Sequence, residues 1–258
     1  DESAQGVERG AVAVLVARQV ESGIPSLQVD HVLTALGLLA AYWRKQCPAR
    51  VIGITGSNGK TTVKEMIGSI LSHSAACLST EANLNNTIGV PLTLLNVGEH
   101  HEYAVIEMGA NGANEIAFSV SVTEPDIALI TNASPAHIEG FGSLQGIVTA
   151  KGEIIDGLKS DGVMVLNADD NYVAEWAARA AGKRTVRFSY ENKSGDAQYF
   201  ASKVVTQDDG TSSFTLHTPG GEQAVSLRFL GKHNVLNAVA ASAVALEAGA
   251  GLMDVAQC

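Results

Sequence analysis

The chain has 258 residues, of which 46% are hydrophobic and 17% are charged, a composition typical of a globular protein with a sizeable core. Its formal net charge of −10 argues against a nucleic-acid partner, because phosphate backbones are bound by basic surfaces. No apolar run reaches the roughly 18 residues that span a bilayer, no signal peptide opens the sequence and the cysteines lack paired spacing, so we expect a cytoplasmic protein without membrane insertion.

The first 48 residues predict two short strands and one helix. Residues 11–17 and 26–29 are short apolar runs of the kind found in β-strands. Between residues 31 and 46, apolar side chains from Val32 to Trp43 recur at helical spacing, which predicts a helix. Pro48 then interrupts the pattern and places a domain boundary at about residues 46–49.

From residue 51 onward, predicted strands alternate with predicted helices. The strands are expected at 51–55, 103–108, 126–131 and 162–166, and the helices at 60–73, 114–122, 144–158 and 171–181. Strands separated by helices imply right-handed crossovers and a parallel sheet covered by helices on both faces. The predicted fold class is therefore α/β, with a mostly parallel sheet of the phosphate-loop type flanked by helices.

The pattern changes after residue 187. Residues 199–205, 212–217 and 224–229 read as three β-strands, separated by the turn signals Asp209-Gly210 and Gly220-Gly221. A last helix is expected over residues 233–248. We therefore predict a small three-stranded antiparallel β insertion near residues 198–230.

A glycine-containing turn joins the strand at 51–55 to the helix that follows. Its backbone N–H groups and the helix N-terminus can surround phosphate oxygens, while Lys60 can reach the β- and γ-phosphates and Thr61 can bind Mg²⁺. The usual spacing of this motif would place a glycine at Ile54, and the alternative is a tight turn with a solvated lysine. The residues expected to bind the triphosphate are Gly56, Ser57, Asn58, Gly59, Lys60, Thr61 and Thr62.

The variant loop TGSNGKTT resembles that of the Mur ligases, ATP-dependent enzymes that join amino acids or peptides to a carboxylate of a cell-wall precursor. Six further segments are similar in order and spacing: ANLNNTIGVPLTLL (82–95), VIEMGAN (105–111), NASPAHIEGFGS (132–143), AKGEI (150–154), LNADD (166–170) and GKHNVLNAVAA (231–241). The first three look most like the branch that adds D-alanyl-D-alanine to UDP-N-acetylmuramoyl-tripeptide in peptidoglycan synthesis. The resemblance implies amide-bond formation through an acyl phosphate, with ATP and two Mg²⁺ ions.

The resemblance also implies a division into domains. Residues 1–48 look like the end of a UDP-sugar-binding N-terminal domain, and residues 49–258 look like the central ATP-binding domain, whereas the C-terminal acceptor-binding domain is absent. The chain begins with Asp1 instead of Met, and residues 251–258 stop at the start of a helix, so both ends look like cuts. We expect a monomer that binds ATP but is inactive as a ligase by itself.

Two side chains that follow predicted strands are candidate metal ligands. Glu107 ends a strand at the edge where open α/β sheets bind ligands, and a carboxylate there suits Mg²⁺. The alternative is that Glu107 caps the following helix. His137 taken alone is a loop histidine, but the resemblance implies that it contacts a second Mg²⁺ ion and belongs to the catalytic set with Lys60 and Lys151.

Lys151 taken alone reads as a surface lysine within a helix. The resemblance implies that CO₂ carboxylates its side-chain nitrogen and that the resulting anion helps to bind Mg²⁺. An unmodified ammonium group beside two metal ions would be repelled, which gives the modification a physical reason.

Several asparagines and aspartates complete the expected nucleotide site. Asn234 and Asn237 lie three apart on the last helix and, by the resemblance, bind the adenine, although Asn234 could instead cap the helix. By the resemblance, Asn86, with Asn83 and Asn85, contacts the γ-phosphate or the substrate carboxylate from a loop that Ile88 and Pro91 anchor. Asp169 and Asp170 either order the nucleotide pocket or cap the helix that begins at 171.

Three other functions fit parts of the sequence. A phosphate-loop kinase or regulatory GTPase shares the loop, but the N-K-x-D guanine signature is missing and the paired asparagines favour adenine. Folylpolyglutamate synthase shares the ATP-driven mechanism of the Mur ligases, but the EMGAN and AHIEGFGS segments argue against it. A nucleotide-binding fragment without turnover is the third alternative.

Overall fold

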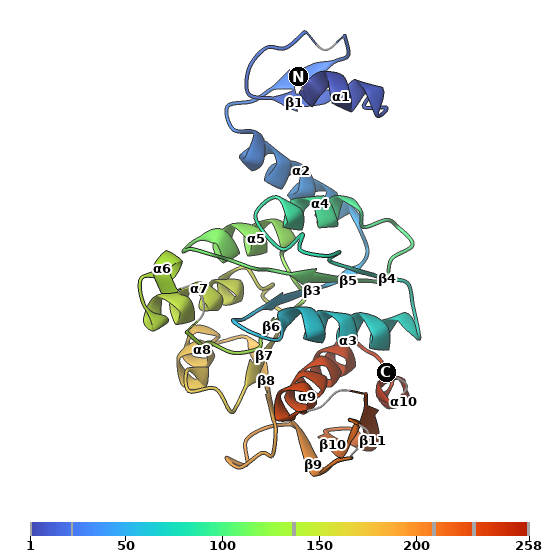
Figure 1. The fold of residues 1–258 in the computed structure, drawn as a ribbon, viewed down its shortest axis with the longest axis vertical. Coiled ribbons are helices and arrows are strands. Elements are labelled where there is room, and N and C mark those ends of the chain that lie inside the picture. The colour runs from blue at the N-terminus through green and yellow to red at the C-terminus, as the bar shows by residue number, and fades with distance from the viewer. Residues whose placement is uncertain (1, 22, 136–137, 208–209, 229–230, 257–258) are drawn as a thin grey trace.

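A nine-stranded sheet forms the centre of the computed structural model, which describes residues 2–21, 23–135, 138–207, 210–228 and 231–256 (Figure 1). Its strands are β3 (Arg50–Thr55), β4 (Cys77–Ser79), β5 (Tyr103–Glu107), β6 (Ile127–Ile130), β7 (Val163–Asn167), β8 (Arg184–Ser189), β9 (Tyr199–Thr206), β10 (Ser212–Thr218) and β11 (Gly221–Leu227). They lie in the order β11-β10-β9-β8-β7-β6-β3-β5-β4. The phosphate-loop strand β3 is therefore an interior strand, flanked by β5 and β6.

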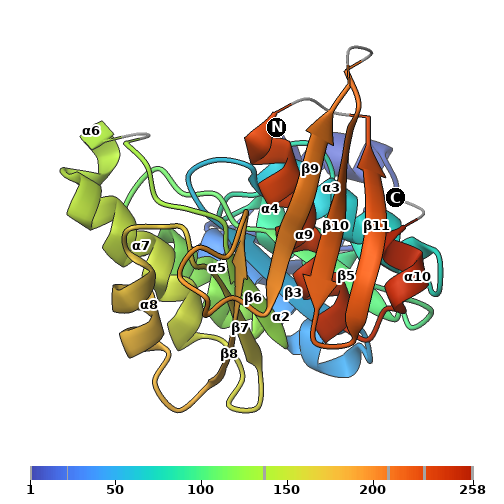
Figure 2. The ribbon, with the colours of Figure 1, turned by 90° about the horizontal axis from the view of Figure 1, so that it is seen from below.

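The sheet is parallel from β4 to β9 and antiparallel beyond that point. The predicted antiparallel group of three strands is confirmed, and Figure 2 shows it as three long neighbouring ribbons. It continues the main sheet, because β9 pairs with β8 through Phe188↔Tyr199 and Ser189↔Phe200. The α/β fold class is confirmed.

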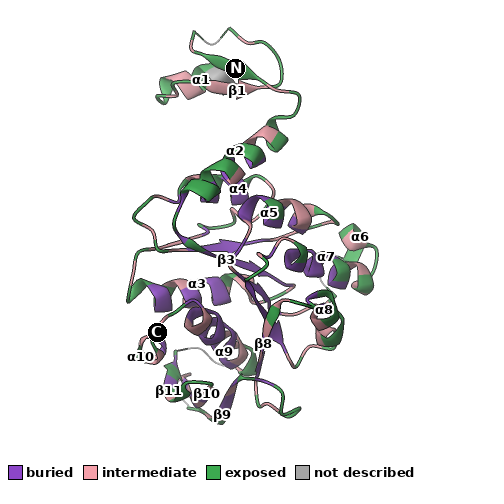
Figure 3. Ribbon diagram, turned by 180° about the vertical axis from the view of Figure 1, so that it is seen from behind, coloured by how far each residue is buried: buried purple, intermediate pink, exposed green. Residues whose placement is uncertain are grey.

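Helices cover both faces of the sheet, because alternate strand residues point to opposite sides. On β3, Ile52 and Ile54 pack into one buried cluster, whereas Val51 packs into the other. The first cluster is covered by α3 (Lys60–Ser72), α9 (Lys232–Glu247) and α10 (Leu252–Val255). The second is covered by α2 (Val32–Gln46), α4 (Gly89–Leu95), α5 (Glu115–Thr123), α7 (Leu144–Asp156) and α8 (Val173–Arg179). Figure 3 shows the strands buried between these helices.

A smaller unit precedes the large sheet. It consists of α1 (Glu2–Glu8) and a two-stranded parallel sheet of β1 (Val14–Val16) and β2 (Ser26–Gln28), and it lies at the far end of α2 in Figure 1. The last turns of α2 pack on the central sheet and its helices, where Trp43 Nε1 donates to the Val97 carbonyl at 2.8 Å and Arg44 pairs with Asp126 at 3.0 Å. Among the described residues, no helix has the length and hydropathy needed to cross a membrane.

Candidate nucleotide and metal site

The phosphate loop, residues 56–59, joins β3 to α3 at the carboxyl edge of the sheet. Gly56 has a φ of +143°, and a Cβ atom there would lie 1.9 Å from Thr131 Oγ1. Gly59 has a φ of +82°, and a Cβ atom there would lie 2.7 Å from Asn237 Oδ1. Both positions therefore require glycine. A side chain at Gly56 would meet Thr131, which follows β6, and a side chain at Gly59 would meet Asn237 of α9.

The segment after β6 holds the phosphate loop in place. The Ser57 N–H donates to the Asn132 carbonyl at 2.9 Å, and the Asn58 N–H donates to Asn132 Oδ1 at 3.1 Å. In return, Asn132 Nδ2 donates to the Asn58 carbonyl at 3.1 Å. These two loop N–H groups therefore already have partners, and the N–H groups that follow them lie at the positively polarised start of α3, a position that favours an anion.

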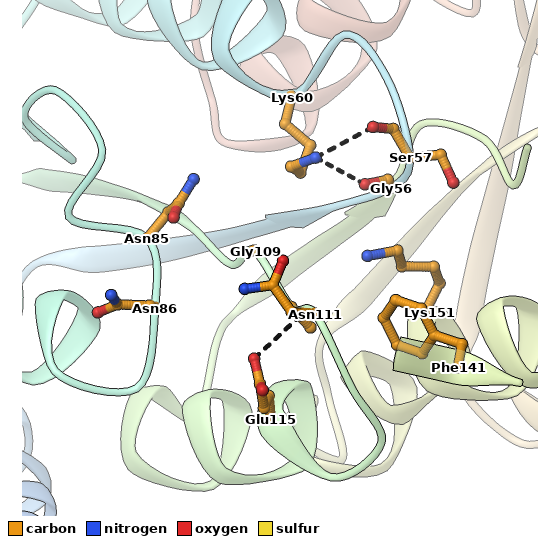
Figure 4. A pocket seen from close by; sticks show the side chains of 11 residues that line it. Gly56, Ser57, Lys60, Asn85, Asn86, Gly109, Asn111, Glu115, Phe141 and Lys151 are labelled. Atoms are coloured by element: carbon orange, nitrogen blue, oxygen red, sulfur yellow. Dashed lines mark hydrogen bonds between the residues drawn. The ribbon is translucent and has the colours of Figure 1, made fainter. Parts of the chain in front are cut away.

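Lys60 is the first residue of α3, and its side chain turns back over the loop (Figure 4). Its Nζ donates to the carbonyls of Gly56 at 2.8 Å and Ser57 at 3.2 Å. Burial lowers the pKa of Lys60, and the negative charge of Glu107 opposes this shift. The ammonium group is thus held at the loop, within reach of a phosphate bound there.

Glu107 ends β5 and is 1% exposed. Its Oε1 accepts hydrogen bonds from Thr61 Oγ1 at 3.3 Å and Asn85 Nδ2 at 2.8 Å. Its Oε2 is buried and has no hydrogen-bond partner among the described residues. A buried carboxylate oxygen without a partner is unfavourable unless a cation or water reaches it, so the site fits a hard cation that prefers oxygen ligands.

The alternative in which Glu107 caps the following helix is wrong. The N-terminus of α5 is capped by Glu153, whose two oxygens accept the N–H groups of Asn114 at 2.9 Å and Ala117 at 2.8 Å. Glu107 instead contacts Thr61 and the asparagine loop. Its carboxylate is therefore available to a ligand at the phosphate loop.

One carboxylate and one hydroxyl are a typical protein contribution to a Mg²⁺ site. Among the described residues, no three His, Cys, Asp or Glu side chains lie together as a metal cluster. Mg²⁺ usually keeps several waters and binds through one or two carboxylates together with substrate phosphates. Thr61 and Glu107 fit that pattern. His137, the predicted ligand of a second ion, lies outside the described residues.

Lys151 projects from α7 toward the same region and is 3% exposed, so the interpretation as a surface lysine is wrong. Its Nζ lies 5.5 Å from the centre of the Phe141 ring. Burial, followed by the charge of Lys60, lowers the pKa of Lys151 to about 8, against the opposing charges of Glu115 and Glu153. The neutral fraction of this amine near physiological pH is therefore larger than that of an exposed lysine.

A cavity of about 140 Å³ separates the two lysines. Figure 4 shows Lys60 and Lys151 entering it from α3 and α7, with Asn85 and Asn86 on another side. A neighbouring hollow is lined by residues 57–62, Asn85 and Glu107. The two spaces share Ser57, Lys60 and Asn85, so a group bound in one lies beside a group bound in the other.

The asparagine loop behaves as predicted only in part. Asn85 reaches Glu107, but Asn86 Oδ1 accepts the N–H groups of Ile88 at 3.1 Å and Gly89 at 2.8 Å at the start of α4. Pro91 is buried, whereas Ile88 is 52% exposed, so Ile88 does not anchor the loop. Ile88 lies just before α4 and is exposed, whereas Val90, in the first turn of α4, is buried in the core.

The last helix places its asparagines near the phosphate loop. The helix α9 begins at Lys232, so Asn234 and Asn237 lie in its first two turns. Asn237 approaches Gly59 as described above. Asn237 therefore adjoins the phosphate loop, and Asn234 precedes it by three residues on the same helix.

Asp170 bonds to the turn that precedes α8, whose N-cap residue is Tyr172, and a role of Asp169 and Asp170 in ordering the nucleotide pocket stays a prediction. Asp170 Oδ1 accepts the Tyr172 N–H at 2.8 Å at the start of α8, and its Oδ2 accepts the Ala133 N–H at 2.8 Å. Asp169 accepts from Ser189 Oγ and the Tyr190 N–H, both at 2.7 Å. The pair thus connects the segments that follow β6, β7 and β8.

Three contributors escaped the sequence analysis as site residues: Asn132, Glu115 and Glu153. Asn132 directly follows Thr131, beyond β6, a position that could have identified it in the same way as Glu107. Glu115 and Glu153 lie on helices, and no periodic signal distinguishes them from exposed glutamates.

Comparisons with known proteins agree with this geometry. The sequence pattern of the Mur ligase middle domain matches residues 54–245. The UDP-N-acetylmuramoyl-tripeptide--D-alanyl-D-alanine ligase of Escherichia coli (strain K12) is 46% identical over 94% of this chain and 53% of its own length. A crystal structure of MurF from Acinetobacter baumannii is 40% identical, with a TM-score of 0.92 over 98% of this chain and 55% of that chain. MurF ligase from Thermotoga maritima, solved in complex with ADP, is 25% identical, with a TM-score of 0.84 over 98% of this chain and 58% of that chain. The chain spans about half the length of these relatives.

Proposed function

The chain belongs to the Mur ligase family, and on that premise we propose that it is the ATP-binding part of a ligase that joins D-alanyl-D-alanine to UDP-N-acetylmuramoyl-tripeptide. The observation that carries the proposal is the buried Glu107 carboxylate, which has one oxygen without a partner and the other bonded to Thr61 of the phosphate-loop helix. Such a pair suits a Mg²⁺ ion carried in by a nucleotide triphosphate. The substrates are those in the name of the Escherichia coli relative, and ADP is bound in the Thermotoga maritima relative.

Each candidate residue has a role in this proposal. Lys60 and the N–H groups at the start of α3 bind the β- and γ-phosphates. Thr61 and Glu107 hold Mg²⁺, and His137 and Lys151 hold a second ion. Asn234 and Asn237 bind the adenine, while Asn85 and Asn86 lie beside the transferred phosphate. The full set proposed for the nucleotide is Gly56, Ser57, Asn58, Gly59, Lys60, Thr61, Thr62, Asn86, Asn234 and Asn237.

The proposed reaction forms an amide bond in two steps. The substrate carboxylate attacks the γ-phosphorus of ATP and ADP leaves, which gives an acyl phosphate. An amine then attacks the acyl carbon, and the C–O bond to phosphate breaks. Bound Mg²⁺ would neutralise charge on the phosphates. The chain itself positions the reacting groups through the loop and Lys60, and electrostatic positioning of this kind is the main contribution of proteins to phosphoryl transfer.

The proposal includes a carboxylated Lys151. Carbamate formation requires a neutral amine, and burial lowers the pKa of Lys151 to about 8, compared with 10.5 for an ordinary lysine. In buffer containing ¹³C-bicarbonate, an NMR carbamate signal is expected to grow as the pH rises from 6.5 to 8.5. It should be absent in Lys151→Met and unchanged in Lys45→Met, which removes an exposed lysine. An equal signal in all three proteins would contradict the modification.

The proposal assigns residues 1–48 to a UDP-sugar-binding domain and residues 49–258 to the central ATP-binding domain. The two-stranded sheet of β1 and β2 and the nine-stranded sheet lie at opposite ends of α2 (Figure 1). This separation supports the division. The proposed setting is a cytoplasmic monomer. The named relatives are a UDP-N-acetylmuramoyl-tripeptide--D-alanyl-D-alanine ligase and MurF, so neither folylpolyglutamate synthase nor a kinase is proposed.

The test uses the complete gene product, incubated with ATP, Mg²⁺, UDP-N-acetylmuramoyl-tripeptide and D-alanyl-D-alanine. We expect ADP, phosphate and the pentapeptide product in equal amounts. Lys60→Ala should lose at least a hundredfold in rate, the typical effect of removing one preorganised charge-stabilising group. Phosphate release without a need for the dipeptide, or pentapeptide formation without ATP, would contradict the proposal.

A further inference from the structure

Glu115 gives the cavity beside the phosphate loop its one acidic wall. Among the described residues that line this cavity, the charged side chains are Lys60, Lys151 and Glu115, and Glu107 faces the neighbouring hollow instead. Figure 4 shows the Glu115 carboxylate below the cavity, on the side away from Lys60. The cavity is therefore cationic on two sides and anionic on one.

The position of Glu115 is fixed by its surroundings. Its Oε2 accepts the Asn111 N–H at 3.1 Å, and among the described residues no side chain or N–H group donates to its Oε1. It is the first residue of α5, and the start of that helix is held by the buried carboxylate of Glu153. Glu153 lies on α7 together with Lys151, so α7 sets the positions of both Glu115 and Lys151 relative to the cavity.

An amine nucleophile faces two difficulties in a cavity of this kind. At neutral pH it arrives as an ammonium cation, which Lys60 and an unmodified Lys151 repel. It must also lose a proton before its nitrogen can attack, and a positioned base typically accelerates such a step by about 10²–10⁴. A carboxylate that lines the cavity, as that of Glu115 does, answers both needs.

We propose that the Glu115 carboxylate receives the ammonium group of the incoming amine and accepts its proton. The proposal rests on the function proposed above, and names the group that binds the second substrate. The ammonium N–H bond breaks, its proton moves to Glu115 and its electron pair stays on nitrogen. That pair forms the new C–N bond as the C–O bond to phosphate breaks. The departing phosphate takes one of the two remaining nitrogen protons, the other stays on the nitrogen of the amide, and Glu115 returns its own proton to water.

The test separates the two half-reactions in the complete gene product. Hydroxylamine is unprotonated at neutral pH, so it can trap the acyl phosphate as a hydroxamate without help from a base. Glu115→Gln keeps an oxygen that can accept the Asn111 N–H. We expect it to lose at least a hundredfold in amide formation with D-alanyl-D-alanine, while hydroxamate formation stays within about threefold of the unmodified protein.

Two further variants and a pH series test whether the carboxylate of Glu115 itself is responsible for the effect. Glu115→Asp should recover part of the amide rate, because it keeps a carboxylate. Glu99→Gln removes an exposed carboxylate near the opposite edge of the sheet and should change neither rate. The amide rate of Glu115→Gln should rise with pH as the free amine accumulates, more steeply than that of the unmodified protein.

Each other outcome has a distinct meaning. An equal fall in hydroxamate and amide for Glu115→Gln would overturn the inference, because Glu115 would then act on the acyl phosphate or on the fold. Unchanged amide formation would also overturn it and would direct attention to a carboxylated Lys151 as the base. If the unmodified protein itself gives no hydroxamate, the proposed function fails instead.

Discussion

Burial of a lysine is costly in this site. Lys151 is 3% exposed, and its pKa is lowered to about 8 chiefly by burial. In the unfolded chain the same group stays protonated up to about pH 10.4. The unfolded state therefore binds more protons between these two values, so the contribution of Lys151 to stability rises with pH from about 8 to 10 and is most unfavourable below pH 8.

Lys151→Met should therefore stabilise the chain at pH 7. Met has a similar length without the charge, and a pKa lowered from 10.5 to about 8 corresponds to on the order of 3 kcal/mol at about 1.4 kcal/mol per pKa unit. Urea unfolding at pH 7 and pH 10 measures the effect, which should shrink at the higher pH. Lys45→Met is the control, since that exposed lysine forms only a surface ion pair. Equal stability of Lys151→Met and the parent at pH 7 would count against the burial argument.

Some of the site follows from single residues and some does not. The positions of Lys60, Thr61 and Glu107 could be predicted, because each adjoins the end of a buried strand, and parallel strands bring those ends to one edge. The burial of Lys151 could not, since the side to which a helix residue points depends on the neighbouring elements. The link between Asn58 and Asn132 joins residues 74 positions apart and leaves no local pattern.

At the scale of elements, the phosphate loop depends on the segment after β6. The Asn132 side chain makes two hydrogen bonds to the backbone of Asn58. Without them the loop gains freedom that ATP binding must remove, while the separate bond from the Ser57 N–H to the Asn132 carbonyl remains.

Asn132→Ala should weaken ATP binding by about tenfold, which corresponds to about 1.4 kcal/mol. Fluorescence titration with an ATP analogue measures this change. Asn96→Ala, which removes an exposed amide bonded to the Leu92 carbonyl at 3.1 Å, is the matched control and should leave the affinity unchanged. Identical affinities for both variants would show that ATP binding does not need the two hydrogen bonds between the Asn132 side chain and the backbone of Asn58.

The junction of α5 with α7 is a second element that can be tested. The Glu153 carboxylate is 8% exposed and accepts two N–H groups at the start of α5, where the helix dipole also favours a negative charge.

Glu153→Ala should lower the free energy of unfolding by about 2–3 kcal/mol, because it removes the charged acceptor of two partly buried N–H groups at the start of α5. Asp156→Ala, on the same helix, removes an exposed carboxylate paired with Arg179 and should change stability by less than about 1 kcal/mol. Thermal or denaturant unfolding compares the two. A loss in Glu153→Ala no larger than that in Asp156→Ala would contradict the capping role.

Most of the long elements could be predicted from periodicity, whereas several of the short ones could not. The strand at 163–167 and the helix at 144–156 are buried or amphipathic over their whole length. The three residues of β4 are too few to establish a period, and β8 carries Arg184 and Arg187 among its apolar residues. Helices α4 and α10 are also short, with seven and four residues respectively.

At the scale of the whole molecule, the strand order concentrates chemistry at one edge. Placing β3 between β5 and β6 brings the phosphate loop, Glu107 and the Asn132 segment together. The alternation of strands and helices predicted a parallel sheet, but not this order, because each crossover can pass to either side of a strand. The pairing of β9 with β8, which joins the antiparallel strands to the main sheet, likewise could not be predicted from local turn signals.

Calorimetric titration of the folded chain with ATP and Mg²⁺ tests whether the phosphate loop and Glu107 together bind Mg·ATP. We expect one ATP per chain, with an affinity that falls at least tenfold, or by about 1.4 kcal/mol, either when Mg²⁺ is omitted or in Glu107→Gln. Absence of binding at millimolar Mg·ATP, or binding equally tight in Glu107→Gln and the unmodified chain, would show that the phosphate loop and Glu107 do not form a Mg·ATP site.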